Sequence, residues 1–163
     1  MSVFDDAVAA VLRHEGGLSM DPDDSGGITR HGISLRAHPD VDILNLTQEQ
    51  AKEIYRHQYW NAIRGDEMPP ALAMCCFDSA VNQGVNAAVR FLQQALRVDV
   101  DGVLGPETMT AAKRAGARTV ALFMERRLEH YEALIHLRPS NQKFARGWRL
   151  RVLETTWDAA RAA

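Results

Sequence analysis

Cysteine is nearly absent from this sequence, and long apolar runs are missing altogether. The two cysteines, Cys75 and Cys76, are neighbours, and adjacent residues of a helix point in different directions and rarely form a disulfide. A disulfide framework is therefore excluded. No stretch approaches the roughly 18 uninterrupted apolar residues that a membrane-spanning helix needs, so we expect no such helix.

The first residues lack the features of a secretory signal. Residues 1–6 have no basic start, and no continuous apolar core precedes a small-residue cleavage site. We therefore expect the protein to be synthesised in the cytoplasm without a signal peptide. If its substrate lies outside, something else must deliver the protein.

The charged and metal-binding residues argue against several classes of function. A formal net charge of −2 gives no overall attraction to nucleic acid, so we expect no nucleic-acid partner. The six histidines form no His-Glu-x-x-His motif. The loop at residues 21–26 opens like a calcium-binding EF-hand, but its twelfth position is Gly32, where a Glu is required. We therefore expect neither a metal nor another cofactor.

The spacing of apolar residues predicts a mostly α-helical chain. With 163 residues, it fits one compact domain with at most two subdomains. Apolar residues at helical spacing from Phe4 to Leu12 predict a first helix that ends near Glu15, before Gly16-Gly17. A long shaped loop follows, with short strands between Leu18 and Ile33.

Further helices follow this loop. A capping box at Thr47 and Gln50 opens a helix that runs to about residue 60. The segment 71–81 is apolar nearly all round, which predicts a central helix buried by its neighbours. Other helices are predicted at 86–96, from residue 106, at 120–136 and at 141–160. We divide the chain into a lobe at 1–85 and a helical lobe at 86–163 that packs on it.

Glu15 lies in the middle of the apolar stripe of the first helix, where a core residue is expected. Partial burial and the negative end of the helix dipole both disfavour the carboxylate, so we expect them to raise its pKa. A raised pKa suits a general acid at neutral pH. The alternative is a glutamate at a frayed helix end whose side chain turns to water.

Two polar side chains follow Glu15 at close spacing. Asp24 comes nine positions later and Thr29 fourteen positions later, in a loop that also holds Asp21. Glycosidic cleavage needs one protonated acid at the leaving oxygen and one carboxylate on the other face of the sugar. Glu15 and Asp24 supply that pair, with Asp21 as the competing second carboxylate. The Thr29 hydroxyl both donates and accepts, which suits it to position water or substrate.

Several short motifs recur along the chain in a recognisable order. They are Glu15-Gly16-Gly17, Asp21-Pro22, Asp24, Gly26-Gly27, Thr29, Gly32-Ile33, Tyr59-Trp60, Phe77-Asp78, Ala80 to Gly84, Phe144 and Gly147-Trp148. Together they resemble the signature of glycoside hydrolase family 108, whose members are N-acetylmuramidases and often phage endolysins. The resemblance implies a lysozyme-like fold with a catalytic loop after the first helix, and Glu15 as the catalytic residue.

The resemblance also implies a reaction and a place of action. The substrate would be the peptidoglycan glycan strand, cut at the β-1,4 bond between N-acetylmuramic acid and N-acetylglucosamine, in the periplasm after holin-type release. A monomer is expected. The chain is also similar to the Glu-x8-Asp-x5-Thr triad of phage lysozymes, but four residues separate Asp24 from Thr29 here. A lytic transglycosylase and a non-catalytic wall-binding module remain as alternatives.

Besides Asp21, five residues are candidates for substrate binding: Tyr59, Trp60, Asp78, Asn82 and Gln83. The aromatic pair is suited to stacking on a sugar ring, although aromatic residues at a helix end more often belong to the core. Asp78 interrupts the buried stretch, and pairing with an arginine is its favoured explanation. The two amides are able to donate hydrogen bonds to N-acetyl groups, although helix termination explains them almost as well.

The second half of the chain has a weaker functional signal. Residues 91–96 and 101–108 resemble the peptidoglycan-binding helical repeat of many wall hydrolases, which implies a packed helical lobe that contacts glycan, although each of these residues also has a structural explanation.

The last helix mixes arginines with large apolar residues: Arg146, Arg149, Arg151 and Arg161 with Phe144, Trp148, Leu150, Val152 and Trp157. Such a mixture suits contact with an anionic outer-membrane surface. The favoured interpretation places the aromatic residues in the core and the arginines in solvent.

Overall fold

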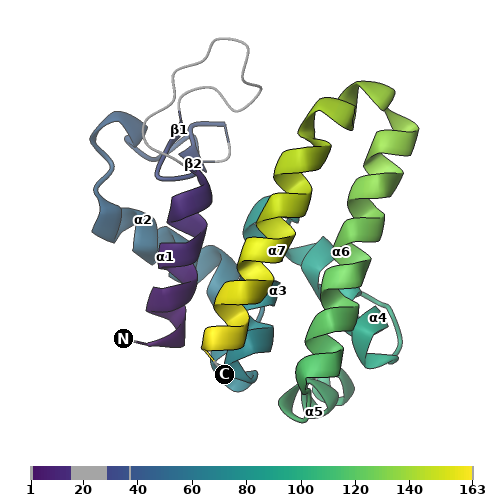
Figure 1. Ribbon diagram of the computed structural model, residues 1–163. Coiled ribbons are helices and arrows are strands. Elements are labelled where there is room, and N and C mark those ends of the chain that lie inside the picture. Colours follow the sequence, from purple (N-terminus) through teal and green to yellow (C-terminus); the bar gives the residue numbers. More distant parts are fainter. Residues whose placement is uncertain (1, 16–28, 37, 163) are drawn as a thin grey trace.

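The computed structural model describes residues 2–15, 29–36 and 38–162, and these residues are mostly helical (Figure 1). The long helices are α1 (Val3–Glu15), α2 (Gln48–Tyr55), α3 (Pro70–Gln83), α4 (Val85–Leu96), α5 (Pro106–Lys113), α6 (Ala117–Leu137) and α7 (Ala145–Arg161). Short helical segments are η1 (Ile43–Asn45), η2 (Arg56–Trp60), η3 (Gly65–Glu67) and η4 (Pro139–Phe144), and the strands are β1 (Thr29–Arg30) and β2 (Ile33–Ser34). The prediction of a mostly helical chain is confirmed. None of the described helices is both long and apolar enough to cross a bilayer.

Helix α1 ends at Glu15, as its apolar spacing predicts. The apolar stripe of α1 packs into the core, where Phe4, Val8 and Val11 are buried. At the other end, the Ser2 hydroxyl accepts a hydrogen bond from the Asp5 amide at 3.2 Å, while the Asp5 carboxylate accepts one from the Ser2 amide at 3.0 Å. This reciprocal pair stabilises the first turn of the helix. The backbone of Glu15 therefore stands at the end of a capped helix that is anchored in the core.

The two strands form a tight hairpin. β1 and β2 are antiparallel, with Thr29 opposite Ser34 and Arg30 opposite Ile33. The turn between them has positive φ at both His31 (51°) and Gly32 (75°), as two-residue hairpin turns with the favoured twist require. The Tyr55 hydroxyl donates to the His31 carbonyl at 2.9 Å. The hairpin is thus fixed to α2.

Four aromatic rings form the centre of the first half of the core. Phe77 lies 6.0 Å from Phe4, 5.9 Å from Tyr55 and 5.6 Å from Trp60, measured between ring centroids and all edge-to-face. Tyr55 and Trp60 point to the same side because η2 is a π-helical turn, in which residues five apart lie above one another. An ordinary α-helix would have turned one of these rings away from the core.

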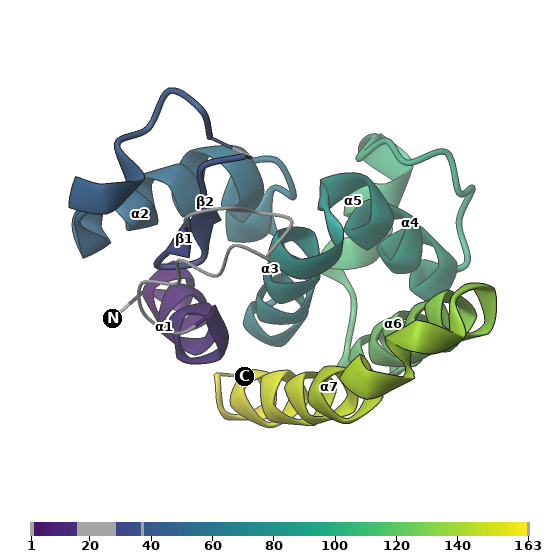
Figure 2. The ribbon, with the colours of Figure 1, turned by 90° about the horizontal axis from the view of Figure 1, so that it is seen from above.

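Helix α3 forms the middle of the fold. Its residues from Leu72 to Ala80 are all buried, which confirms the prediction of a central helix. It packs against α1, α4, α6 and α7, and Figure 2 shows these helices arranged around it. Gly84, with φ of 92°, ends it. One continuous hydrophobic core therefore extends from Phe4 in α1 to Ala159 in α7.

A buried glutamine shapes the connection between α4 and α5. Gln93 is 0% exposed; its amide nitrogen donates to Asp101 Oδ1 at 2.6 Å and to the Val103 carbonyl at 3.0 Å, and its oxygen accepts from the Gly102 amide at 2.8 Å. Gly102 has φ of 80°. The residues that resemble a peptidoglycan-binding repeat therefore build this turn.

Helices α6 and α7 lie side by side (Figure 1), and Figure 2 shows α7 along the edge of the molecule. The expectation that the aromatic residues around α7 belong to the core is wrong for Phe144 and Trp157, which are 47% and 66% exposed. Trp148 is half-buried and stacks on Tyr131 at 4.7 Å. The expectation that the arginines lie in solvent is wrong for Arg151, which contacts a buried acid.

Candidate active site

Glu15 closes the last turn of α1, and the β1–β2 hairpin lies beside that end of the helix (Figures 1 and 2). Thr29 is the first residue of β1 and is partly buried. The side chain of Glu15, together with Asp21 and Asp24, lies outside the described residues. The structure therefore places the end of α1, where the backbone of Glu15 lies, beside the hairpin that begins at Thr29.

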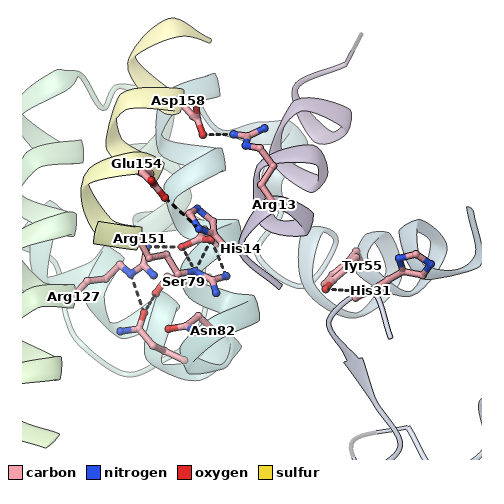
Figure 3. Close-up of polar contacts among 12 residues, drawn as sticks. Arg13, His14, His31, Tyr55, Ser79, Asn82, Arg127, Arg151, Glu154 and Asp158 are labelled. Atoms are coloured by element: carbon pink, nitrogen blue, oxygen red, sulfur yellow. Dashed lines mark hydrogen bonds and ion pairs between the residues drawn. The ribbon is translucent and has the colours of Figure 1, made fainter. Parts of the chain in front are cut away.

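An ion pair and a histidine–carboxylate contact hold the last turn of α1 against α7 (Figure 3). Arg13 Nη2 binds Asp158 Oδ2, and His14 Nδ1 lies 3.4 Å from Glu154 Oε2. The two acids are one helical turn apart on α7, so they meet consecutive residues of α1. Because Glu15 directly follows His14, these contacts fix the position and direction of the chain at Glu15.

A buried carboxylate joins α3 to α6 and α7 through Arg127 and Arg151, which are labelled in Figure 3. Asp78 is 2% exposed, with its oxygens 2.8 Å from Arg127 Nη1 and 2.9 Å from Arg151 Nη2. Burial alone would raise the pKa of the Asp78 carboxyl, but the two guanidinium groups outweigh it and hold the pKa below its ordinary value. The candidate substrate contact of Asp78 is therefore corrected, and the favoured explanation, pairing with an arginine, is the one that the structure shows, because Arg127 and Arg151 occupy its oxygens.

The end of α3 presents two oriented amide side chains, Asn82 and Gln83. The Tyr131 hydroxyl donates to Asn82 Oδ1. Gln83 Oε1 accepts from Arg127 Nε at 3.0 Å and from the Ser79 hydroxyl at 2.7 Å. Since each amide oxygen is engaged as an acceptor, each amide nitrogen is directed toward another partner. Asn82 is exposed, and Gln83 Nε2 is buried without a partner among the described residues.

Sequence reasoning missed Arg127 and Tyr131, although a signal for them was present. Phe123, Arg127 and Tyr131 are four residues apart in α6, so they share one face of the helix, and all three are buried. A cation between two aromatic residues on a buried face indicates an internal partner, because an unpaired buried charge is costly. The contacts of His14 and Glu154 have no comparable pattern in the sequence.

The two aromatic candidates have different environments. Trp60 is 1% exposed, and its Nε1 donates to Asp66 Oδ1 at 2.8 Å. A Cβ atom at Gly65 would lie 2.5 Å from the Trp60 ring, so only glycine fits beneath it. The expectation that Trp60 stacks on a sugar is therefore corrected: it is a core residue. Tyr59 is half-buried, 5.9 Å from the Tyr55 ring, and keeps part of its ring accessible.

Comparison with known proteins places the chain in a family. Residues 8–84 match the model of the family described as glycosyl hydrolase 108, and residues 87–153 match that of the family described as a predicted peptidoglycan domain. A solved structure of SagA from Brucella abortus is 32% identical, with a TM-score of 0.83 over 98% of this chain and 94% of that one. The chain belongs to the glycosyl hydrolase 108 family. Among curated proteins, none is significantly similar in sequence.

This glycosyl hydrolase 108 protein is a glycoside hydrolase of the bacterial cell wall, with a lysozyme-like fold and peptidoglycan as its substrate. The two matched segments meet between residues 84 and 87, at the junction of α3 and α4. Asp78 belongs to the first segment, whereas Arg127 and Arg151 belong to the second. The buried ion pairs therefore tie the two segments of the hydrolase together.

The cysteines of this hydrolase are unsuited to nucleophilic catalysis. Cys75 and Cys76 are both buried in α3. Burial raises the pKa of the Cys75 thiol to about 12 and that of the Cys76 thiol well above its ordinary range. Since the thiolate is the nucleophile, neither residue supports a cysteine-dependent reaction. Within the described ranges, no three His, Cys, Asp or Glu side chains are grouped as metal ligands.

Removal of the Tyr131 hydroxyl tests the orientation of Asn82 in the hydrolase. We expect Tyr131→Phe to raise KM for soluble peptidoglycan fragments about 2- to 10-fold with little change in kcat, because one hydrogen bond that holds the amide is lost. Steady-state kinetics measures both. In an Asn82→Ala background the same substitution should not change KM further. An effect of full size in that background would show that Tyr131 acts independently of Asn82.

Proposed function

We propose that this hydrolase cuts the β-1,4 bond between N-acetylmuramic acid and N-acetylglucosamine, with Glu15 as the general acid. The observation that carries the proposal is the position of Glu15 at the end of α1, in a turn held to α7 by Arg13 and His14. A general acid has to be fixed relative to the leaving oxygen, and a capped, pinned helix provides that rigidity.

The proposed mechanism uses two carboxyl groups. Glu15 donates its proton to the glycosidic oxygen as the bond to C1 breaks. Asp24, or Asp21 in its place, acts from the other face of the sugar, either by activating water or by attacking C1. Thr29, on the hairpin beside the end of α1, positions the water or the substrate through its hydroxyl. No cofactor is required in this scheme.

The substrate contacts follow from an oriented amide. Asn82, which is exposed, donates a hydrogen bond to an N-acetyl carbonyl oxygen of the glycan, and Tyr59 offers an accessible part of its ring to a sugar. Gln83 is not assigned a glycan contact, because its Nε2 is buried. Support comes from the amide oxygen of Asn82, which already accepts from the Tyr131 hydroxyl. The Asn82 nitrogen is therefore directed before the substrate arrives, which lowers the entropy lost on binding.

For the biological role, we propose a phage or prophage endolysin that is made in the host cytoplasm and reaches the wall after holin-type release, acting as a monomer. This proposal is supported by the two family matches, because the glycosyl hydrolase segment and the peptidoglycan segment share one hydrophobic core. The endolysin role predicts that induction of the protein alone leaves cells intact, whereas induction together with a holin lyses them.

Analysis of the reaction products tests the bond specificity. Digestion of purified peptidoglycan is expected to release fragments with N-acetylmuramic acid at the reducing end, as mass spectrometry after borohydride reduction will show. The reason is that hydrolysis adds water across the bond on the C1 side of that sugar. Anhydromuramic ends would identify a lytic transglycosylase, reducing N-acetylglucosamine would identify the other glycosidic bond, and wall binding without soluble fragments would identify a binding module.

A further inference from the structure

The outward face of α7 exposes large apolar side chains. Leu150, Leu153 and Trp157 are 49%, 67% and 66% exposed. At 100° per residue, these side chains fall within about 120° of the helix circumference, together with the exposed Arg146, Arg149 and Arg161. We call these six residues the α7 stripe. Monomeric soluble proteins rarely expose such a contiguous apolar surface unless it has a binding partner.

The charge of this region is opposite to that of the rest of the chain. Residues 137–163 contain six Lys and Arg and two Asp and Glu, a net charge of +4, whereas residues 1–136 contain thirteen and nineteen, a net charge of −6. The two acids, Glu154 and Asp158, lie at the side of α7 that faces α1, where they contact His14 and Arg13. The α7 stripe itself is apolar and cationic.

The position of α7 leaves the stripe accessible. Figure 2 shows α7 along the edge of the molecule, with the other helices on its inner side. The residues that face inward are small or β-branched: Ala145, Val152, Thr155 and Ala159 are buried. Leu153 and Trp157 also border an open groove of about 650 Å³ between α7 and α1. The larger apolar residues of the helix thus face away from the core.

We propose that the α7 stripe docks on a lipid bilayer with anionic phospholipid headgroups, with α7 lying in the plane of the interface. Leucine and tryptophan side chains of such a helix enter the boundary between headgroups and acyl chains, and arginines pair with lipid phosphates. A second copy of the chain fits less well, because it would place three arginines against three arginines. The membrane contact goes beyond glycan hydrolysis and would hold the enzyme at the membrane that borders its substrate.

Binding of the full chain to vesicles tests the proposal. Phosphatidylglycerol vesicles are expected to sediment the protein and to shift its tryptophan emission to shorter wavelength, whereas phosphatidylcholine vesicles bind it far more weakly. Arg146→Gln/Arg149→Gln should weaken binding about 30-fold, and Leu150→Ser/Leu153→Ser at least about 10-fold. Trp157→Phe should keep most of the binding but lose most of the emission shift. As a matched control, Arg114→Gln/Arg118→Gln removes two exposed arginines outside the stripe and should bind as the parent does.

Three results would overturn the proposal. The first is a parent protein that does not bind phosphatidylglycerol vesicles, or stripe variants that bind as well as the parent. The second is a dimer, detected by light scattering, that Leu150→Ser/Leu153→Ser abolishes. The third is loss of binding to purified, lipid-free peptidoglycan in the stripe variants, which would make the stripe a glycan surface. Stripe variants should digest soluble peptidoglycan fragments at the parent rate, so failure of the glycosidase proposal is detected separately, by product analysis.

Discussion

Glu15→Gln is expected to lower kcat for peptidoglycan hydrolysis by about 10²- to 10⁴-fold, the usual contribution of a general acid. Glutamine keeps the size of the side chain but has no proton to give to the leaving oxygen. Release of soluble fragments from purified peptidoglycan measures the effect. The melting temperature should stay close to that of the parent, because the contacts that fix the end of α1 come from Arg13 and His14.

A matched control separates this effect from a general loss of charge. Glu132, an exposed residue of α6, lies in another helix, and Glu132→Gln should leave kcat unchanged. Asp24→Asn and Asp21→Asn then identify the second carboxylate, since only the acid that acts on the sugar should cause a loss comparable to that of Glu15→Gln. Retention of activity in Glu15→Gln would assign the acid to another residue and refute the proposed mechanism.

The second large effect is expected on stability rather than on catalysis. Asp78→Asn should lower the free energy of unfolding by about 3–5 kcal/mol, because it leaves buried guanidinium groups without their carboxylate. Arg127 is 0% exposed and has no access to water that would compensate. Urea denaturation at neutral pH measures the loss. Glu129→Gln is the matched control: it breaks the exposed pair with Arg126 and should cost less than about 1 kcal/mol.

The ion pairs of Asp78 also predict that the free energy of unfolding depends on pH. In the folded protein the pKa of Asp78 lies below its ordinary value of 3.8, so the carboxylate contributes its full stability above that value and loses it as the pH falls through the folded pKa. Acidification should therefore destabilise the parent more than Asp78→Asn, and the two unfolding free energies should converge at low pH. Parallel curves would mean that Asp78 is not the group responsible.

The parts of the fold that were predicted correctly depend on local signals. The end of α1 follows from an apolar stripe that stops at a pair of glycines. The capping box of α2 is present as predicted, with the Thr47 hydroxyl accepting from the Gln50 amide at 3.2 Å and Gln50 Oε1 accepting from the Thr47 amide at 2.9 Å. The burial of α3 follows from apolar residues all round the helix. Each of these signals lies within one turn or one helix.

The parts that were predicted wrongly depend on how helices meet. α7 buries Thr155 and Ala159 and exposes Leu153 and Trp157, although hydrophobicity alone favours the opposite face. Small residues allow α7 to approach α1 and α3 closely, and Arg151 gains the Asp78 carboxylate there. For Trp60 the core position, which was favoured for an aromatic residue at a helix end, is correct, and only its candidate role in sugar stacking is not. The π-helical turn contributes to its burial by changing which residues share a face.

The position of Asp78 has a consequence for building chimeric wall hydrolases. The family boundary near residue 85 separates two segments in sequence, but Asp78 and its two arginines lie on opposite sides of that boundary. A chimera joined there would keep a buried acid from one parent and depend on the other parent for its countercharges. Exchange of the second segment between relatives therefore requires an arginine at both positions 127 and 151 of the incoming helices.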